Sequence, residues 1–369
     1  KNSIIFSKNR CVNVHGTDGL YIGENVAYDT VGHCYALELG SETNNLFDKN
    51  IGVLTKKASA AASGETDTTP ATFLITHPGN SWTGNVAAGS EHYGFWISLI
   101  SGVSNEVVKS FADNTIHSTF HMGIRSNPVG WRPSVPQTLV NTKVYRNRVR
   151  GMFLQLSSNI IFDGGFVSDC RHAVDVRLSD YITFKNFFIR GNTDDYMAIV
   201  NSRVGQPSHC TTATSGIRPH INVYTAGNEG TTLENVGFSH FARPECNANS
   251  VAISMDSHYR VQSFTAPTSF SGITFDTTAS KDAISLCRIA TQGVTNIAIL
   301  DADGSFDPAG SSTGPGTIVS DDVSMTDGKT CEAMINSCAQ YCQGDSALKA
   351  GAAPAPSPAT APSPTEPAP

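Results

Sequence analysis

Short runs of β-branched and aromatic residues recur along residues 1–325, and Gly, Asn, Asp and Ser separate them. Such runs, bounded by turn formers, are typical of short strands. Runs of ten or more helix formers are few in this region. The pattern therefore predicts an all-β domain over residues 1–325.

A phrase of Asn followed by small or β-branched residues opens several of these runs. It begins at Asn25, Asn50, Asn85, Asn114, Asn147 and Asn235. The first four intervals are 25, 35, 29 and 33 residues, and a repeat of this length without a helical period indicates a solenoid. Asn tolerates left-handed backbone at a turn, and stacked Asn side chains can share amide hydrogen bonds. We predict a right-handed parallel β-helix. The alternative, a β-sandwich, would favour Asn-Gly hairpin turns, which do not occur between these runs.

The C-terminal part of the chain changes character. Residues 350–369 read AGAAPAPSPATAPSPTEPAP and hold 7 of the 18 prolines, which predicts a disordered, extended Pro/Ala/Ser-rich tail. This tail resembles hydroxyproline-rich modules of plant and algal wall proteins, and a plain linker is the alternative. The expected domains are the β-helix at 1–325, a short Cys-containing segment at 326–349 and the tail at 350–369.

The nine cysteines bear on the compartment. Cys331, Cys338 and Cys342 form a local cluster that suggests disulfides in an oxidising environment. Cys34 and Cys287 lie in apolar runs and could instead be small core residues. The chain begins at Lys1, so any signal peptide is expected upstream. We predict a secreted or cell-surface location.

Charge excludes some classes of partner. The formal net charge is -7 and charged residues make up only 15% of the chain, which argues against a nucleic-acid partner. No run of 18 apolar residues occurs, so no membrane span is expected in this chain.

Four stretches together resemble one known family. They are residues 24–56, which read ENVAYDTVGHCYALELGSETNNLFDKNIGVLTK, and residues 69–96, 114–125 and 299–320. They resemble the β-helix region of the fibrocystin-like and cell-surface hyaluronidase family, whose members typically carry a G-eight domain upstream. The resemblance implies an extracellular β-helix that binds polysaccharide, with a cell-wall or extracellular-matrix glycan as partner. It also implies an alternative, a glycosidase or lyase acting on a hyaluronan-like acidic polysaccharide. A purely structural display domain is a third reading.

Histidines that precede strand-like runs are the candidates for catalysis. His33, His92 and His121 each follow a repeat Asn by 7 or 8 residues, and equivalent residues of a β-helix stack about 4.8 Å apart. A column of these histidines, flanked by Glu38, Glu91 and Arg125, is therefore predicted. Glycoside hydrolysis needs two carboxylates, for which Glu38 and Glu42 are the candidates, and Arg125 could hold a sugar carboxylate. A stacking ladder that serves stability alone is the alternative.

Two further groups of residues are candidate ligand sites. Trp82, Tyr93, Phe95 and Trp96 could stack on sugar rings, although aromatic residues of this kind also fill solenoid cores. Asp301, Asp303, Ser305 and Asp307 alternate as oxygen ligands do in a calcium loop. Phe306 stands where an EF-hand needs Gly and Ser312 where it needs Glu, so only a looser calcium site, or else a Gly-centred turn, is expected.

Overall fold

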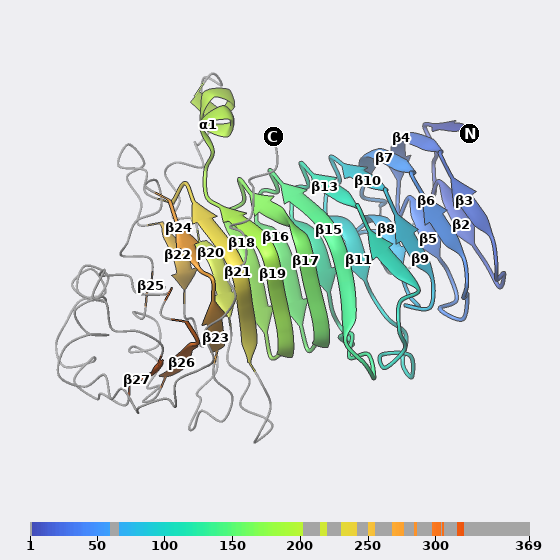
Figure 1. Ribbon diagram of the computed structural model, residues 1–369. Coiled ribbons are helices and arrows are strands. Elements are labelled where there is room, and N and C mark those ends of the chain that lie inside the picture. Colours follow the sequence, from blue (N-terminus) through green and yellow to red (C-terminus); the bar gives the residue numbers. More distant parts are fainter. Residues whose placement is uncertain are drawn as a thin grey trace. The chain divides into compact units, whose positions relative to one another are not determined.

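Parallel strands stacked in successive rungs form both compact units of the chain in a computed structural model, Lys1–Arg171 and His172–Pro369 (Figure 1). The residues that the structure describes are 2–59, 66–201, 215–219, 230–241, 250–254, 268–276, 284–285, 297–303, 305 and 316–320. The predicted segments 326–349 and 350–369 lie outside the described residues. The predicted all-β class and parallel β-helix are confirmed.

Three strand columns make up the first unit, and the chain passes through them in a fixed order. Face 1 consists of β1 (Ser3–Ile5), β4 (Val26–Val31), β7 (Ile51–Lys56), β10 (Val86–Ala88) and β13 (Thr115–His117). Face 2 consists of β2 (Val12–Val14), β5 (Tyr35–Leu37), β8 (Ala71–Ile75), β11 (Tyr93–Ile97), β14 (Met122–Ser126) and β16 (Arg150–Gln155). Face 3 consists of β3 (Tyr21–Gly23), β6 (Leu46–Asp48), β9 (Ser81–Thr83) and β12 (Ser110–Ala112). In the last rungs faces 3 and 1 merge into β15 (Gln137–Tyr145) and β17 (Ser158–Ser168).

A ladder of buried asparagines joins the rungs where face 3 turns into face 1. Asn50 donates from Nδ2 to Oδ1 of Asn85 at 3.1 Å, and Asn85 donates in the same way to Asn114 at 3.1 Å. Asn25 donates to Asn50 at 2.9 Å. All four side chains are buried, and every amide meets its hydrogen-bonding needs from the neighbouring rung. At these four positions the repeat phrase marks the corner between faces 3 and 1, whereas Asn235 lies within β21 (Thr231–Ser239).

Aromatic rings stack along the axis of the first unit to form its core. Tyr35, Phe73 and Phe95 of face 2 stack with ring centroids 4.9 and 4.5 Å apart. Phe47 and Trp82 of face 3 stack at 4.0 Å. Because parallel register places equivalent residues over one another, each ring packs flat against a ring of a neighbouring rung.

A disulfide links the first two rungs. Cys11 and Cys34 are bonded, with Cα atoms 4.4 Å apart. Hydrogen bonds from Cys11 N and Val12 N to Cys34 O show that the two residues are neighbours across a rung boundary. The suggestion that Cys34 is only a small core residue is therefore wrong. Cys170 is free and buried, whereas Cys331, Cys338 and Cys342 lie outside the described residues.

The second unit also stacks its described strands in parallel. One column holds β18 (His172–Arg177), β20 (Ser215–Pro219), β22 (Val251–Ser254) and β25 (Ile284–Ser285). The other holds β19 (Asp180–Arg190), β21 (Thr231–Ser239), β23 (Thr268–Ser271), β24 (Thr274–Phe275) and β26 (Ile297–Asp301). β27 (Gly316–Ser320) pairs antiparallel with β26.

One helix, α1 (Asp194–Asn201), appears among the described residues. Thr193 precedes it, and its hydroxyl oxygen accepts a hydrogen bond from Tyr196 N at 3.3 Å, as an N-cap does. A membrane-crossing helix would have to be longer and more apolar than any helix in the described part of the chain.

Candidate polysaccharide-binding surface

The turns between face 1 and face 2 stack over three consecutive rungs of the first unit. They are residues 89–92, 118–121 and 146–149. Phe120 N donates to Ser90 O at 2.8 Å, and Arg148 N donates to Thr119 O at 2.9 Å. Asn147 fixes the last of these turns, because its Oδ1 accepts from the Thr119 N–H at 2.9 Å and from the Thr119 hydroxyl at 2.7 Å. The side chains that follow therefore project from one continuous corner.

We call this the corner surface and define it by the side chains that it gathers. They are His92, Tyr93, Phe120, His121, Arg125, Tyr145, Arg146, Arg148 and Arg150. Phe120 is 54% exposed and Arg148 is also exposed. His92, His121 and the other three arginines are half-buried, so polar groups of this surface reach solvent.

Each arginine of the corner surface lies over an aromatic ring. The Cζ of Arg148 lies 4.5 Å from the ring centroid of Phe120. The Cζ of Arg146 lies 6.0 Å from that of Tyr145, and the Cζ of Arg150 lies 5.1 Å from that of Phe153. Arg125 lies 4.7 Å from the centroid of Tyr93 and 4.9 Å from that of Trp96. Stacking on an aromatic face orients a planar guanidinium and leaves its N–H edge for an anion.

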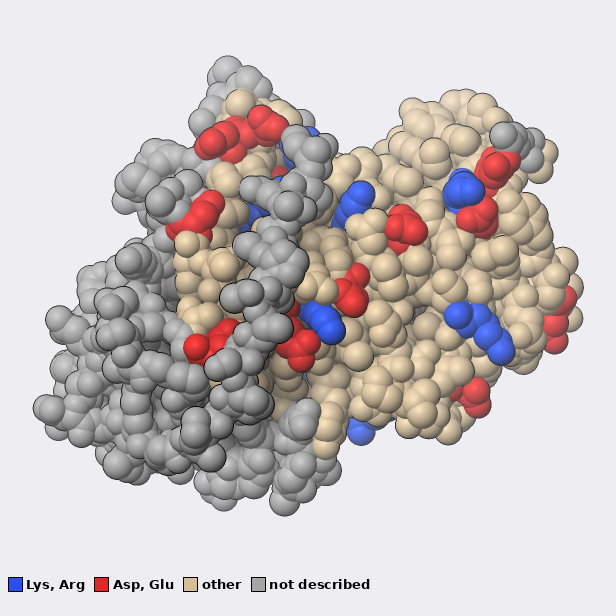
Figure 2. Space-filling model, viewed as in Figure 1, with Lys and Arg blue, Asp and Glu red and all other residues tan. Residues whose placement is uncertain are grey.

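Three of these arginines have no acidic partner in the part of the chain that the structure describes. Arg125, Arg146 and Arg148 form no ion pair with a carboxylate among the residues that the structure describes. Arg10, by contrast, is paired with Glu38 at 3.4 Å and with Asp67 at 3.3 Å, and Lys56 is paired with Asp29 at 2.6 Å. In a chain of net charge -7, a local cluster of unpaired arginines is a place where an anion gains Coulomb energy. Figure 2 shows how sparse charged side chains are on the face it presents.

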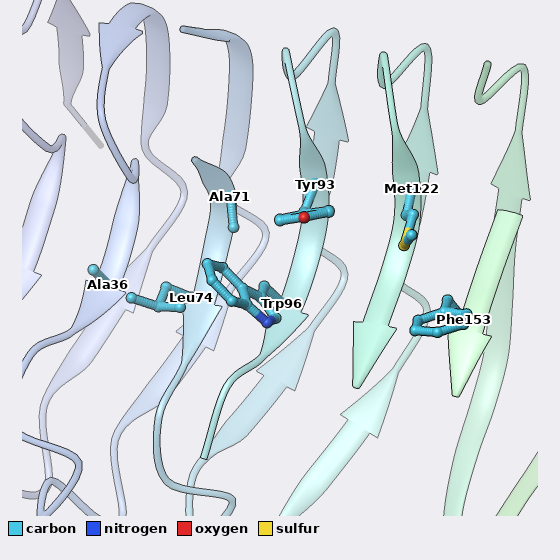
Figure 3. Close-up of a cluster of buried hydrophobic side chains, with 7 residues drawn as sticks. All are labelled: Ala36, Ala71, Leu74, Tyr93, Trp96, Met122 and Phe153. Atoms are coloured by element: carbon cyan, nitrogen blue, oxygen red, sulfur yellow. The ribbon is translucent and has the colours of Figure 1, made fainter. Parts of the chain in front are cut away.

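All four predicted aromatic side chains are buried, and only Tyr93 and Trp96 lie against an arginine of the corner surface, Arg125. A Cβ at Gly94 would meet Ile116 Cγ2 at 2.2 Å, so Gly94 faces the interior and Tyr93 before it lies on the outer side of face 2. Trp96 contacts Tyr93 there, with centroids 5.1 Å apart. Figure 3 shows both rings on β11, with Met122 on the next strand, β14, and Phe153 on the strand after that, β16. Trp82 and Phe95 are fully buried in the core, so for them the core alternative holds.

The predicted histidine column divides in the structure. His92 and His121 are neighbours, with ring centroids 5.9 Å apart. Burial lowers the pKa of both imidazoles, and Arg125 acts in the same direction. His33 is fully buried, and its Nδ1 accepts a hydrogen bond from Ala71 N at 3.0 Å. His33 therefore holds the backbone of the next rung, which is the stabilising role given as the alternative.

The predicted carboxylates lie away from the corner surface. Glu38 accepts from Asn13 Nδ2 at 2.5 Å and contacts His15 Nδ1 at 2.8 Å, and the hydrogen bond from His15 is the main cause that lowers its pKa. Glu42 is buried and accepts from the backbone N–H groups of Leu39, Gly40 and Gly16 at 2.8–3.2 Å. Burial acts to raise the pKa of Glu42, but these hydrogen bonds outweigh it and lower the pKa. Both side chains are engaged in local structure.

The predicted calcium ligands bind backbone groups where they are described. Asp303 Oδ2 accepts from Gly272 N at 2.7 Å, and Ser305 Oγ accepts from Ile273 N at 2.9 Å. Asp301 is the last residue of β26, and Asp307 lies outside the described residues. Among the described residues, no group of three His, Cys, Asp or Glu side chains could hold a metal ion. A calcium site stays a prediction, and the described contacts are those of a turn.

Three basic residues of this surface were absent from the predicted set: Arg146, Arg148 and Arg150. The signal for them is the alternation Arg-Asn-Arg-Val-Arg at residues 146–150 in a chain poor in charge. Alternate residues of an extended segment point to one side, so this run could have indicated a cationic edge.

Comparison with known proteins gives a family match for the N-terminal part of the chain. Residues 1–124 match the family model of the CEMIP beta-helix. The cell surface hyaluronidase of Danio rerio is 32% identical over 157 residues, which cover 33% of this chain and 11% of that protein. Human fibrocystin-L is 23% identical over 270 residues, which cover 65% of this chain and 6% of that protein. The chain thus spans only about a tenth of the length of such relatives. The predicted resemblance is confirmed.

A solved structure, the Dettilon tailspike protein, is similar with a TM-score of 0.39 and 12% identity, covering 86% of this chain and 69% of that one. Within the corner surface, Arg125, Arg146, Arg148 and Arg150 lie beyond the family match at residues 1–124. The case for these arginines therefore rests on the geometry of this chain.

Proposed function

We propose, on the premise that residues 1–124 are a CEMIP beta-helix domain, that this chain is an extracellular β-helix whose corner surface binds an acidic polysaccharide. The observation that carries the proposal is the set of arginines without acidic partners, stacked on aromatic rings over three rungs. Guanidinium groups recognise carboxylates through paired N–H donors, and aromatic rings stack on sugar faces. The names of relatives, which include cell surface hyaluronidases, make hyaluronan the first polymer to test.

An extracellular location is part of the proposal. The disulfide between Cys11 and Cys34 supports it, because such bonds persist in oxidising compartments. Cell-surface relatives, such as the one from Danio rerio, point in the same direction.

The corner surface favours binding over glycoside hydrolysis. Hydrolysis uses two carboxylates that flank the scissile bond. The three turns of the corner contain one acidic residue, Glu91, and its carboxylate accepts a hydrogen bond from Lys57 N at 2.7 Å. The corner surface, by contrast, offers a polyanion the exposed Arg148 stacked on the exposed ring of Phe120.

Replacing Arg148 tests this function. We expect Arg148→Ala to weaken hyaluronan binding about tenfold or more, because a hydrogen bond to a charged group contributes about 1.5–3 kcal/mol and each 1.4 kcal/mol is about tenfold in affinity. Isothermal titration calorimetry on the full chain measures the effect. Added salt should weaken binding by the wild type, since exposed charges are screened beyond about 10 Å at 0.1 M salt.

Lys49→Ala is the matched control for Arg148→Ala. Lys49 is an exposed cation next to Asp48, with Nζ 3.8 Å from the carboxylate, and it lies in the turn between faces 3 and 1. Its loss removes the same unit of charge away from the corner surface. Equal affinities for Arg148→Ala and Lys49→Ala would contradict the proposed function.

A further inference from the structure

Four side chains of the corner surface form a compact cluster that anion binding alone does not require. His92, Tyr93, His121 and Arg125 come from the ends of two adjacent turns and the strands β11 and β14 that follow them. The Tyr93 ring centroid lies 5.6 Å from that of His92 and 5.8 Å from that of His121. Arg125 donates from one terminal nitrogen to the Tyr93 hydroxyl and from the other to Asn127 Oδ1 at 2.9 Å.

Polar atoms in this cluster lack partners, which is uncommon for buried groups. Nδ1 of His92, Nδ1 of His121 and Nε of Arg125 are buried and have no hydrogen-bond partner among the residues described. A buried polar atom without a partner costs about 1–3 kcal/mol. These three atoms belong to side chains that lie against the Tyr93 ring, and they point to a ligand that would satisfy them.

The protonation states of the cluster suit proton transfer. Burial lowers the pKa of His121, and the positive charges of Arg150 and Arg125 and the neighbouring His92 lower it further. Its imidazole is therefore neutral near pH 7 and can accept a proton. Burial raises the pKa of Tyr93 although Arg125 opposes this, so its phenol keeps its proton and can donate it.

We propose that this cluster cleaves a uronate-containing polysaccharide by β-elimination, an inference that rests on the proposed binding function. Arg125 pairs with the uronate carboxylate and stabilises the negative charge that develops there. The imidazole of His121 takes the proton from C5, and the C5–H electron pair forms the C4–C5 double bond. The C4–O4 bond breaks, and O4 receives the proton of the Tyr93 hydroxyl.

The reaction balances without a cofactor or water. It leaves an unsaturated uronate on one product, a new hydroxyl on the other, an imidazolium at His121 and a phenolate at Tyr93. Transfer of the proton from His121 to Tyr93 restores both groups. Arg125 stabilises the phenolate meanwhile, because it already donates to that oxygen.

The test follows the conjugated double bond of the product. The full chain is incubated separately with hyaluronan, chondroitin and polygalacturonate, and the ultraviolet absorbance of the unsaturated uronate is recorded beside the binding affinity for each polymer. We expect absorbance to rise with a polymer that binds. Tyr93→Phe and His121→Asn should each lower its rate by a factor of about 10²–10⁴, the usual contribution of a general acid or base.

Matched controls keep the result interpretable. Tyr21→Phe and His15→Asn make the same chemical changes at exposed positions of the first rungs, and they should leave the rate unchanged. Tyr93→Phe keeps the buried ring, so circular dichroism should match that of the wild type. A polymer that binds but gives no unsaturated product overturns the β-elimination while the binding function stands. Product formation that survives both substitutions overturns it as well, and failure of all polymers to bind overturns both proposals.

Discussion

Replacing Asn85 by Ala is expected to lower the free energy of unfolding by about 3–5 kcal/mol, since each buried polar group left unsatisfied costs about 1–3 kcal/mol. Asn85 is fully buried, and its Oδ1 accepts from both the backbone N–H and the Nδ2 of Asn50 at 3.0 and 3.1 Å. Its own Nδ2 donates to Phe47 O at 2.9 Å. Alanine removes every one of these bonds and leaves donors on one rung and an acceptor on another without partners.

Urea denaturation of Asn85→Ala measures this loss, with Asn105→Ala as its control. Asn105 is exposed, and its substitution should change the unfolding free energy by no more than about 0.5 kcal/mol. If the two variants were equally stable, the asparagine ladder would not be the support of the rungs that the hydrogen bonds describe.

Acid should destabilise the protein through His33. Burial is the largest influence on the pKa of this imidazole and lowers it to about 4. The hydrogen bond from Ala71 N to Nδ1 is made only by the neutral ring, because a protonated Nδ1 would face another N–H. Nearby, Thr66 Oγ lies 3.2 Å and Asp67 Oδ1 3.6 Å from Nε2.

The sign of the effect follows from proton counting. Between pH 6.5 and 4 the unfolded chain binds a proton at His33 and the folded chain does not, so stability falls as the pH falls through this range. The full contribution is present above pH 6.5. Its size is about 3 kcal/mol, given about 1.4 kcal/mol per pKa unit.

Measuring the free energy of unfolding against pH in His33→Gln and in the wild type separates the contribution of His33 from those of the other titrating groups. Glutamine can still accept from Ala71 N but does not titrate. The loss of unfolding free energy between pH 7 and pH 4 should therefore be about 3 kcal/mol smaller in His33→Gln than in the wild type. An unchanged pH dependence in His33→Gln would mean that His33 is not held neutral in the fold.

Repeating asparagines were sufficient to predict the fold class, because one physical cause lies behind their spacing. Asn25, Asn50, Asn85 and Asn114 share a column. Asn147 repeats the same phrase but lies at the other end of face 1, where it binds Thr119. The reason is that β15 runs through the corner as a single strand, so the next rung needs no Asn turn there. Sequence spacing alone cannot show where two strands merge.

The site was harder to predict, because outward and inward residues of β11 do not follow simple alternation. Tyr93 and Trp96 lie on the outer side, whereas Phe95 lies in the core. Gly94, next to Phe95, also faces inward, toward Ile116. The prediction of a histidine column held for His92 and His121 but not for His33, because the residues around Asp67 cover His33. Likewise, the sequence does not show which arginines lack a carboxylate partner, because that depends on which side chains meet on the folded surface.

Hydroxyl-radical footprinting with and without hyaluronan tests the binding surface most directly. Phe120 on the corner surface is 54% exposed, while Phe6 and Tyr21 on the first rungs are each 62% exposed. All three rings should react with radicals in the free protein. The account predicts that hyaluronan protects Phe120 and leaves Phe6 and Tyr21 as reactive as before. Protection of Phe6 and Tyr21 with Phe120 unchanged would place the polymer elsewhere and contradict it.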